Sequence, residues 1–341
     1  MKRIQTYWYR NRLHPLLLPL LPLSTVFGWA TRLRRWSYQS GLQKRRRFSL
    51  PVIIVGNISV GGTGKTPLVI ALANYLKTAG RNPGIALRGV GGQNQSQPLL
   101  VDAKANPFVV GDEAVLIAQS THCPVVACVD RPAAVAALQA AGCDLVLCDD
   151  GLQHYRLQRS LEIAVVDGKR YFGNGRLLPA GPLREPLARL QEVDFVVVNE
   201  PEKPTAGLLN LAKPTFEMQL KMTGFHALHH HTAPVLLSHF QGKKVHAVAG
   251  LGHPQRFFDR LASLGIDCIP HSFPDHYPYQ SSDLDFSDTL PIVMTEKDAV
   301  KCQKLSFTEA SKARQWFLRV EAEMSLHFKH ALLNRIHGES L

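Results

Sequence analysis

Short apolar runs alternate with segments of helical periodicity over most of the chain. The runs are rich in valine, isoleucine and leucine and end at glycine, proline or aspartate, which is typical of buried parallel strands. They lie at 52–55, 83–92, 123–129, 145–148, 163–166 and 193–198, the second of them closing in a glycine turn. Because helical spacing separates these runs, the pattern predicts an α/β fold with a mostly parallel sheet and helices on both faces.

Two later segments have strictly alternating polarity. Phe216, Met218, Leu220 and Met222 alternate with charged or amide residues, and the segment from Trp316 to Met324 repeats the pattern. Strict alternation is typical of a half-buried strand. Further strand and helix patterns occupy 240–312 between the two segments, whereas the polar segment 93–107 is expected to be a loop. We therefore expect a second, smaller α/β domain that the chain enters along one strand and leaves along the other.

A glycine-rich turn joins the first predicted strand to the first predicted helix. It has the sequence G-N-I-S-V-G-G-T-G-K-T at 56–66. Backbone N–H groups in such a turn, and the positive end of the helix that follows, both favour an anion. The P-loop pattern requires a glycine five positions before Gly64, where this chain has Ser59. We interpret the turn as a P-loop variant because Gly61, Gly62 and Gly64 still permit it; the alternative is an ordinary glycine turn.

This loop predicts how a nucleotide would be held. Lys65 would reach the β- and γ-phosphates of ATP, and the Thr66 hydroxyl would hold Mg²⁺. Arg88 after the second strand and Arg184 in a segment rich in glycine and proline are candidates to neutralise phosphate charge, although Arg88 could equally be a solvated strand-end arginine. The remaining candidate nucleotide-binding positions are Ser59, Val60, Gly61, Gly62, Thr63 and Gly64.

Carboxylates stand at two positions where chemistry is expected. Asp149 and Asp150 end the strand at 145–148. Mg²⁺ prefers one or two carboxylates together with water and phosphate oxygens, so this pair predicts a second metal-binding element beside the loop. The alternative is a simple Asp-Asp-Gly turn. Asp112 precedes a predicted helix. The alternative to a chemical role is that Asp112 only caps the N-terminus of this helix.

The formal charge of +12 is concentrated in the first fifty residues. This segment contains eleven Lys or Arg and no Asp or Glu, which leaves 28 basic against 27 acidic residues in the rest. Between its basic flanks lies an apolar stretch at 13–31 that contains Pro15, Pro19 and Pro22. Because each proline removes a helix donor, we disfavour a membrane-crossing helix and expect an interfacial segment on an anionic membrane surface. The alternative is an arm packed on the protein's own surface.

Two further observations concern the partners of the protein and its cellular compartment. Leucine and proline are interleaved with the basic residues, so a nucleic-acid partner is not expected. The six cysteines form no C-x-x-C pair, and most lie in apolar runs, which indicates small core residues in a reducing compartment.

Several motifs occur between about residues 50 and 300. They are G-N-I-S-V-G-G-T-G-K-T-P at 56–67, G-D-E at 111–113, D-D-G-L-Q-H at 149–154, G-N-G at 173–175, L-P-A-G-P-L-R-E-P at 178–186, F-P-D-H at 273–276 and T-E-K-D at 295–298. In type and order they resemble the tetraacyldisaccharide 4'-kinases, the enzymes that phosphorylate the lipid A precursor. The block at 178–186 is the most specific, and Ser59 fits the resemblance too. Val90 departs from it, since that family usually has tyrosine there.

The resemblance implies an ATP- and Mg²⁺-dependent kinase. Its acceptor would be the 4'-hydroxyl of a tetraacylated glucosamine disaccharide 1-phosphate, reached from the cytoplasmic face of the inner membrane, to which the N-terminus would attach the protein without spanning the bilayer. Carried over by motif, Asp112 would be the general base and His276 its partner. Lys65, which would neutralise phosphate charge, is the third catalytic candidate. The residues implied around the metal and phosphates are Asp149, Asp150, Gln153, His154 and Glu185, with Glu185 among the metal ligands.

The patterns and the resemblance together predict the domain organisation. We expect a basic and apolar N-terminal segment (1–50), a P-loop kinase domain (51–212), a two-stranded β linker (213–224 and 315–325), a second α/β domain (225–314) and a C-terminal helix (326–341). Asp112 and His276 would then lie on different domains, so that domain closure would assemble the site. The chain is expected to act as a monomer.

A membrane-recruited regulatory ATPase of the partitioning or division-site type is the alternative function. The loop of those proteins also contains G-G-T-G-K-T, but it carries a lysine before the first glycine, where this chain has Val60. Those proteins also lack the blocks near 178 and 273.

Overall fold

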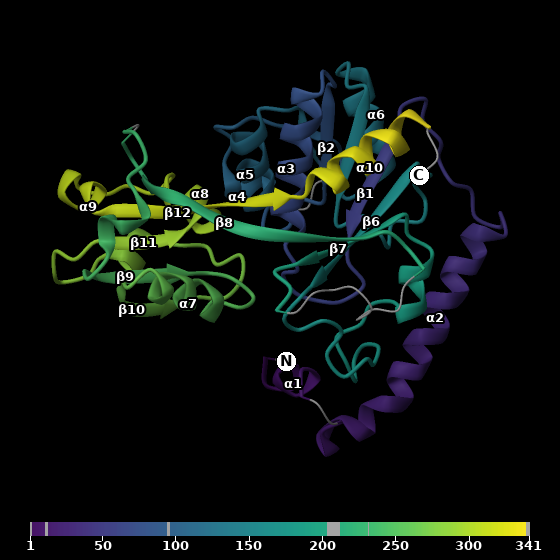
Figure 1. The fold of residues 1–341 in the computed structure, drawn as a ribbon, viewed down its shortest axis with the longest axis horizontal. Helices are drawn as coiled ribbons and strands as arrows, with labels where there is room; N and C mark the ends of the chain where they lie inside the picture. Colours follow the sequence, from purple (N-terminus) through teal and green to yellow (C-terminus); the bar gives the residue numbers. More distant parts are fainter. Residues whose placement is uncertain (1, 11–12, 94–95, 203–211, 231, 339–341) are drawn as a thin grey trace. The chain divides into compact units, whose positions relative to one another are not determined.

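The chain forms two compact units, neither of which is continuous in sequence. The computed structural model describes residues 2–10, 13–93, 96–202, 212–230 and 232–338 (Figure 1). Unit 1 comprises Met1–Ala86, Arg131–Gln219 and Glu323–Leu341, and unit 2 comprises Leu87–Asp130 and Leu220–Ala322.

This division differs from the predicted one at residues 87–130, which we expected within the P-loop domain. Within unit 2, helix α5 (Asp112–Thr121) contacts helix α8 (Glu296–Cys302), which lies far along the chain. Such long-range packing assigns a segment to a unit whatever its sequence neighbours are, and a run of strand and helix patterns does not reveal it.

Unit 1 is built on a parallel sheet with the order β8-β7-β6-β1-β5-β2 (Figure 1). Its strands are β1 (Val52–Gly56), β2 (Pro83–Leu87), β5 (Leu145–Asp149), β6 (Leu161–Asp167), β7 (Phe195–Asn199) and β8 (Thr215–Ala227). All residues of β1, β5, β6 and β7 are buried, as expected for parallel strands covered on both faces.

Helices pack on this sheet through apolar stripes. Helix α3 (Lys65–Thr78) contacts β1 and β5 and buries Leu68, Leu72 and Leu76. The other helices of unit 1 are α1 (Lys2–Trp8), η1 (Pro15–Leu20), α2 (Leu21–Gln39), α6 (Arg131–Ala140), η2 (Leu187–Gln191) and α10 (Leu326–His337). The predicted α/β fold class with a mostly parallel sheet is confirmed.

In unit 2, parallel strands follow one another in the order β10-β9-β11-β12. These strands are β9 (Lys244–Ala249), β10 (Asp267–Ser272), β11 (Ile292–Thr295) and β12 (Gln315–Met324), and the helices are α4 (Pro107–Val110), α5, η3 (Leu237–Phe240), α7 (Gln255–Ser263), η4 (Ser281–Leu284), α8 and α9 (Glu309–Ala313). Strands β3 (Leu99–Val101) and β4 (Val125–Ala127) pair antiparallel. The prediction of a loop over 93–107 was wrong at β3, which is too short to show a period.

The two strands with alternating polarity, β8 and β12, are neighbours in the sheet and each passes from one unit into the other. In β8, Phe216 and Met218 are buried and Glu217 is exposed, as the alternation predicts. Glu323 and Met324 at the end of β12 return the chain to unit 1, where α10 follows.

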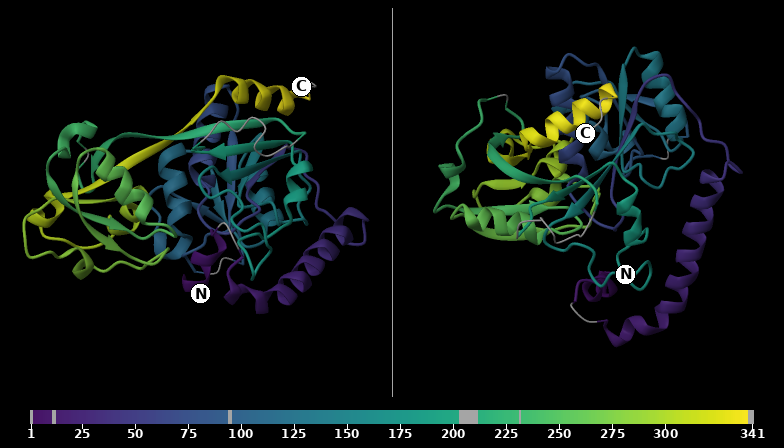
Figure 2. Two further views of the ribbon diagram at one scale, coloured as in Figure 1. Left: turned by 60° about the horizontal axis from the view of Figure 1, so that its bottom comes forward. Right: turned by 45° about the vertical axis from the view of Figure 1, so that its right-hand side comes forward.

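The N-terminal prolines are compatible with a long helix, so they do not by themselves argue against a membrane-crossing segment. Pro15 and Pro22 lie at the first positions of η1 and α2, where a missing N–H has no intrahelical partner to lose. Among the described residues, the helical stretch Pro15–Gln39 is long and apolar enough to cross a membrane by length and composition, with 17% of its most apolar window buried. Figure 2 shows α2 as one uninterrupted helix.

Candidate active site

The phosphate loop of unit 1 has a backbone that requires glycine at its last position. Gly64 has φ 93°, and a Cβ atom there would lie 2.5 Å from Asn199 Nδ2. Asn199, at the end of β7, donates a hydrogen bond from Nδ2 to the Thr63 carbonyl at 3.1 Å. The loop is thus held from β7, which β6 separates from β1 in the sheet, and helix α3 begins directly at Lys65.

The block at 178–186 supports the phosphate loop. The N–H of Val60 donates to the Pro182 carbonyl at 2.8 Å, and the N–H of Arg184 donates to the Ile58 carbonyl at 2.7 Å. Ser59 forms an isolated antiparallel bridge with Leu183. Ser59, which departs from the usual P-loop pattern, therefore pairs with the block at 178–186. Local sequence patterns do not predict this contact.

Asp150 contacts two of the three cations that we expected to neutralise phosphate charge. Lys65 Nζ lies 3.5 Å from Asp150 Oδ1, and Arg184 Nη1 donates to both carboxylate oxygens at 3.1 Å. Burial disfavours the charged carboxylate, but the positive charges of Lys65 and Arg184 outweigh that effect and lower the pKa of Asp150 to about 2. Asp150 has φ 52°, an uncommon value for a residue other than glycine that is often found at functional sites.

Thr66 and Asp149 form a donor set suited to Mg²⁺. Thr66 Oγ1 donates to Asp149 Oδ2 at 3.1 Å, and Asp149 is 3% exposed. In the sheet register Asp149 pairs with Val55, next to the start of the loop. The described residues contain no cluster of three or more His, Cys, Asp or Glu that could hold a metal. A hydroxyl and one carboxylate still fit Mg²⁺, which takes its other ligands from water and phosphate.

Glu185, which is predicted as a metal ligand, contacts the side chains of three other residues. Tyr155 Oη donates to Glu185 Oε2 at 2.7 Å, Gln153 Nε2 donates to Oε1 at 2.6 Å, and Arg189 Nε lies 3.3 Å from Oε2. Burial and the charge of Glu185 raise the pKa of Tyr155, which remains a donor. Protein groups therefore contact both of its oxygens and link it to the residues around the loop, while its role as a metal ligand stays a prediction.

The other implied nucleotide-binding residues are distributed around this network. Gln153 Nε2 also donates to the Asn57 carbonyl at 3.1 Å, so it links Glu185 to the residue that follows β1. The carbonyl of His154 accepts a hydrogen bond from Arg159 Nη2 at 2.7 Å. Arg88 is exposed after β2 and belongs to unit 2.

Asp112 and His276 lie together within unit 2. The distances from His276 Nδ1 to the two Asp112 oxygens are 3.0 and 3.1 Å, and Asp112 is 2% exposed. The expectation that they lie on different domains was wrong, because α5 belongs to the same unit as the 273–276 loop. The N-cap alternative for Asp112 is also wrong: the N-cap is Gly111, whose φ is 94°.

Space for this pair depends on a neighbouring glycine turn. His276 has φ 57°, and a Cβ atom at Gly91 would lie 2.8 Å from His276 Nδ1. The second glycine turn, predicted after β2, therefore borders the imidazole. Hydrogen bonding to Asp112 raises the pKa of His276 against the opposing effect of burial.

Two lysines of α8 contact the pair and were not assigned any role from the sequence. Lys301 Nζ lies 3.4 Å from Asp112 Oδ2, and Lys297 Nζ lies 3.4 Å from His276 Nε2. Burial would raise the pKa of Asp112, but the hydrogen bond from His276 and the nearby lysines lower it. The signal in the sequence is the spacing of four residues, which places both lysines on one face of a helix.

Arg170 is a further residue of unit 1 that sequence reasoning missed. Its Nε donates to Asp167 Oδ2 at 2.8 Å, and its Nη2 donates to the Gly62 carbonyl at 3.1 Å. Its guanidinium also lies over the Tyr9 ring, 5.0 Å from the centroid. Arg170 therefore ties the phosphate loop both to the end of β6 and to the residue after α1.

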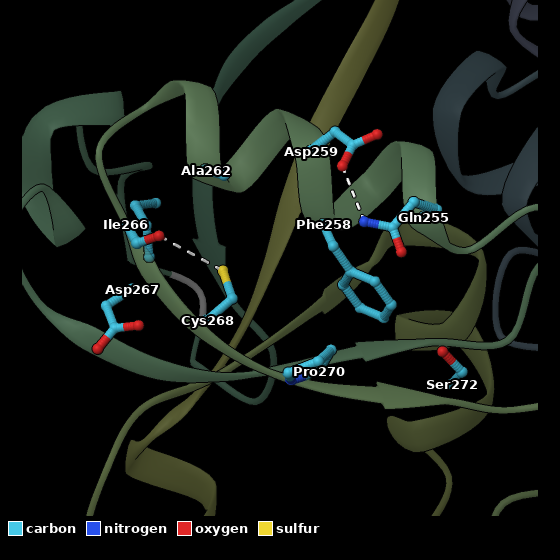
Figure 3. Close-up of a pocket in the computed structure, with 9 residues that line it drawn as sticks. All are labelled: Gln255, Phe258, Asp259, Ala262, Ile266, Asp267, Cys268, Pro270 and Ser272. Carbon is cyan, nitrogen blue, oxygen red and sulfur yellow. Dashed lines mark hydrogen bonds between the residues drawn. The ribbon is translucent and has the colours of Figure 1, made fainter.

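A cavity of about 440 Å³ lies elsewhere in unit 2, between α7 and β10 (Figure 3). Its lining consists of Gln255, Phe258, Asp259, Ala262, Ile266, Asp267, Cys268, Pro270 and Ser272. None of the candidate site residues belongs to this lining, so the cavity is not the site assembled above.

Comparison with known proteins agrees with these residues. The family model described as tetraacyldisaccharide-1-P 4'-kinase matches residues 16–337. The tetraacyldisaccharide 4'-kinase of Alkalilimnicola ehrlichii is 47% identical over 345 residues, covering 98% of this chain and 100% of that protein. The tetraacyldisaccharide 4'-kinase of Xanthomonas euvesicatoria pv. vesicatoria is 46% identical over 340 residues, covering 98% and 96%.

A solved structure is similar as well. The structure of LpxK from Aquifex aeolicus, described as a complex with ATP, has a TM-score of 0.78 and 30% identity, and the match covers 94% of this chain and 99% of that one. These matches give no support to a regulatory ATPase of the partitioning or division-site type. By sequence over nearly its whole length and by fold, the chain belongs to the tetraacyldisaccharide-1-P 4'-kinase family.

Proposed function

We propose that this protein transfers the γ-phosphoryl group of ATP to the 4'-hydroxyl of a tetraacylated glucosamine disaccharide 1-phosphate, yielding the 4'-phosphorylated lipid and ADP. The observation that carries the proposal is the phosphate loop with Lys65 at the first position of α3 and Thr66 3.1 Å from Asp149. Family membership supplies the acceptor, and the ATP in the Aquifex aeolicus relative supplies the donor.

The nucleotide would be bound by groups that already surround the loop. Loop N–H groups and the start of α3 would face the phosphates, and Lys65 and Arg184 would turn from Asp150 toward them. Thr66 and Asp149 would hold Mg²⁺, with Asp150 beside them. When bound, Mg²⁺ supplies charge neutralisation between the β- and γ-phosphates.

The acceptor hydroxyl would lose its proton to Asp112. In the transfer, the bond from the acceptor oxygen to the γ-phosphorus forms, the bond from that phosphorus to the bridging oxygen of ADP breaks, and the hydroxyl proton moves to the carboxylate. His276 would orient Asp112 through the contact at 3.0 Å. A carboxylate with a lowered pKa is a weak base, but a loose transition state asks little of it before the phosphoryl group has moved. Such bases contribute roughly 10²- to 10⁴-fold.

The test is a radiolabelled transfer assay. Purified protein is incubated with γ-labelled ATP and the tetraacylated disaccharide 1-phosphate in mixed micelles, and labelled lipid and free phosphate are measured. We expect one labelled lipid per ADP formed, none from Lys65→Ala, and normal transfer from Lys77→Ala in the last turn of the same helix. ATP hydrolysis without labelled lipid would refute the kinase.

We also propose that the N-terminal segment places the protein on the anionic cytoplasmic face of the inner membrane. Large apolar side chains are exposed along one side of α2, at spacings of three and four residues: Leu23, Val26, Trp29, Leu33 and Trp36. The opposite side packs on unit 1, where Ser24 Oγ donates to the Leu177 carbonyl at 2.8 Å. Basic residues flank the apolar stretch, as in segments that bind acidic headgroups.

Vesicle co-sedimentation tests this placement. Binding to vesicles that contain an anionic phospholipid should exceed binding to neutral vesicles and should weaken with salt. A Trp29→Ser, Leu33→Ser variant should lose binding, whereas Leu100→Ser, which alters an equally exposed leucine of unit 2, should not. Equal binding by all three proteins would refute the assignment.

A further inference from the structure

Lys301 is a buried cation placed between two buried carboxylates. Its Nζ lies 3.4 Å from Asp112 Oδ2 and 3.3 Å from Asp298 Oδ1, and its side chain is 3% exposed. The Tyr279 ring lies beneath the ammonium, 5.0 Å from centroid to Nζ. Taking an ammonium out of water is costly, so a lysine is buried in this way only where charges compensate it.

One of the two carboxylates is fixed independently of the lysine. Asp298 Oδ2 accepts a hydrogen bond from the Gly250 N–H at 2.8 Å and one from Thr295 Oγ1 at 2.6 Å. A Cβ atom at Gly250 would lie 2.7 Å from Asp298 Oδ1, so the strand end leaves room only for glycine beside it. Asp298 therefore forms a rigid anchor for Lys301, which leaves the ammonium directed to Asp112.

Asp112 also has partners besides the lysine. His276 contacts both of its oxygens, and Oδ1 accepts the Glu113 N–H at 2.8 Å. Loss of Lys301 would therefore leave both carboxylates with hydrogen-bond donors. What disappears is the ammonium charge 3.4 Å from Asp112 Oδ2.

We propose that Lys301 is a positioning residue for the kinase: its buried ammonium, anchored by Asp298, keeps Asp112 a carboxylate and holds it against His276. This inference rests on the proposed role of Asp112 as the acceptor base. Lys301 acts through Asp112 and touches neither substrate, so it differs from Lys65, which would contact phosphate.

The remaining charges around Asp112 belong to three elements. Lys297, on the same helix as Lys301, donates to Glu113 Oε1 at 3.0 Å and to Asp275 Oδ1 at 3.1 Å. Its charge is thus shared between two other carboxylates. His276 faces Asp112 from the 273–276 loop, with Nε2 3.8 Å from Asp275. Among the described ion pairs, the ammonium of Lys301 contacts two carboxylates, those of Asp112 and Asp298.

Removal of this charge should make Asp112 easier to protonate. An opposite charge within about 4–6 Å lowers a carboxyl pKa. His276 and Lys297, which lower the pKa of Asp112 more than Lys301 does, remain in place in a Lys301→Met variant, so we expect the pKa of Asp112 to rise without reaching that of an unpaired buried carboxyl. The fraction of ionised Asp112 then falls at low pH and recovers as the pH rises. The acid limb of kcat should move upward by the same amount, while KM for ATP stays unchanged.

The experiment compares Lys301→Met, Lys301→Arg and the control Lys312→Met, which removes a surface lysine that is paired with Glu309 at 2.7 Å. The first readout is the pH dependence of kcat with both substrates saturating. The second is the titration of the Asp112 carboxyl carbon by NMR on protein labelled in aspartate, with the signal assigned by its loss in Asp112→Asn. Because the second readout needs no substrate, it reports on Lys301 even if the kinase assignment fails.

The outcomes distinguish a role of Lys301 in positioning Asp112 from a role in packing alone. Support requires that Lys301→Met shifts both the acid limb and the Asp112 titration upward, while Lys301→Arg and Lys312→Met stay close to the original protein. If Lys301→Met and Lys301→Arg lose activity equally at every pH, or if the Asp112 titration does not move in Lys301→Met, the lysine only fills space and the inference is overturned. A shift of the titration without kinase activity in the original protein would retain the inference and remove the proposed function.

Discussion

Gly64→Ala should weaken ATP binding, because this glycine sets the path of the phosphate loop. Its φ of 93° is available to glycine at little cost, and the space beside its Cα is taken up by the amide of Asn199. An added methyl group has two ways to fit. Either the backbone leaves the left-handed region, which turns the N–H groups of the loop away from the phosphates, or Asn199 moves and releases the Thr63 carbonyl.

In the second case, in which the backbone keeps its path and Asn199 moves, two costs add. A left-handed alanine costs about 1–2 kcal/mol, and the Asn199 hydrogen bond to Thr63, 3.1 Å long, contributes about 1 kcal/mol. If the bound nucleotide holds the loop in its present path, the sum of about 2–3 kcal/mol is taken from ATP binding. That loss corresponds to a Kd higher by roughly 30- to 150-fold.

Gly80 offers a matched control at the other end of the same helix. It has φ 79°, and a Cβ atom there would meet nothing within 4 Å. Gly80→Ala therefore has the same backbone cost without the steric one, and it should lower thermal stability by a few degrees while leaving the Kd unchanged. Isothermal titration of both variants with ATP and Mg²⁺ measures the difference. A Gly64→Ala variant that binds ATP as tightly as Gly80→Ala would show that the loop does not hold the phosphates.

Three other predictions concern separate parts of the site. Asp112→Ala should lower kcat by about 10²- to 10⁴-fold with little change in the Kd for ATP, since it removes the proposed base without altering the loop; near-normal turnover would exclude this role. Glu185→Gln should weaken ATP binding and thermal stability together and leave the Mg²⁺ concentration for half-maximal activity unchanged, because Glu185 holds Gln153 and Tyr155; a raised Mg²⁺ requirement would instead support its predicted role as a ligand. Asp150 has a folded-state pKa lowered from 3.8 to about 2, so its ionised form stabilises the fold above pH 3.8, and this contribution is lost as the pH falls to about 2. Asp150→Asn should therefore flatten that part of a curve of stability against pH. An unchanged curve would contradict the pairing of Asp150 with Lys65 and Arg184.

Local patterns predicted the elements whose causes are local. β1, the glycine loop and α3 follow one another within 52–78, so composition and spacing contain the whole signal. The parallel strands β1, β2, β5, β6 and β7 were visible for the same reason, since each is a buried run that is mostly apolar, and β8 was visible by its alternating polarity. The resemblance then predicted that Asp112 and His276 act as partners, and in the structure His276 Nδ1 lies 3.0 Å from Asp112 Oδ1.

The contacts that sequence reasoning missed lie where distant segments meet. The resemblance implied Glu185 as a metal ligand, which stays a prediction, but it did not reveal that the side chains of Gln153, Tyr155 and Arg189 contact its two oxygens. Arg170 stands three residues after a strand-end aspartate, which gives no hint that its guanidinium reaches Gly62. Periodicity predicts which face of a helix or strand is buried, but it does not predict which segment packs against that face.

The placement of residues 87–130 changes how the site can work. With α5 assigned to the P-loop domain, the Asp112–His276 contact would form only when two domains close, and nucleotide binding could govern it. The structure instead forms the contact inside unit 2, where α5 packs on α8 and where Lys297 and Lys301 neighbour the pair. The contact that orients the proposed base is then a local property of unit 2. It follows that the titration of Asp112 in the protein without ATP should already respond to His276→Gln, whereas in a site assembled by closure this substitution would change the titration only after nucleotide binds.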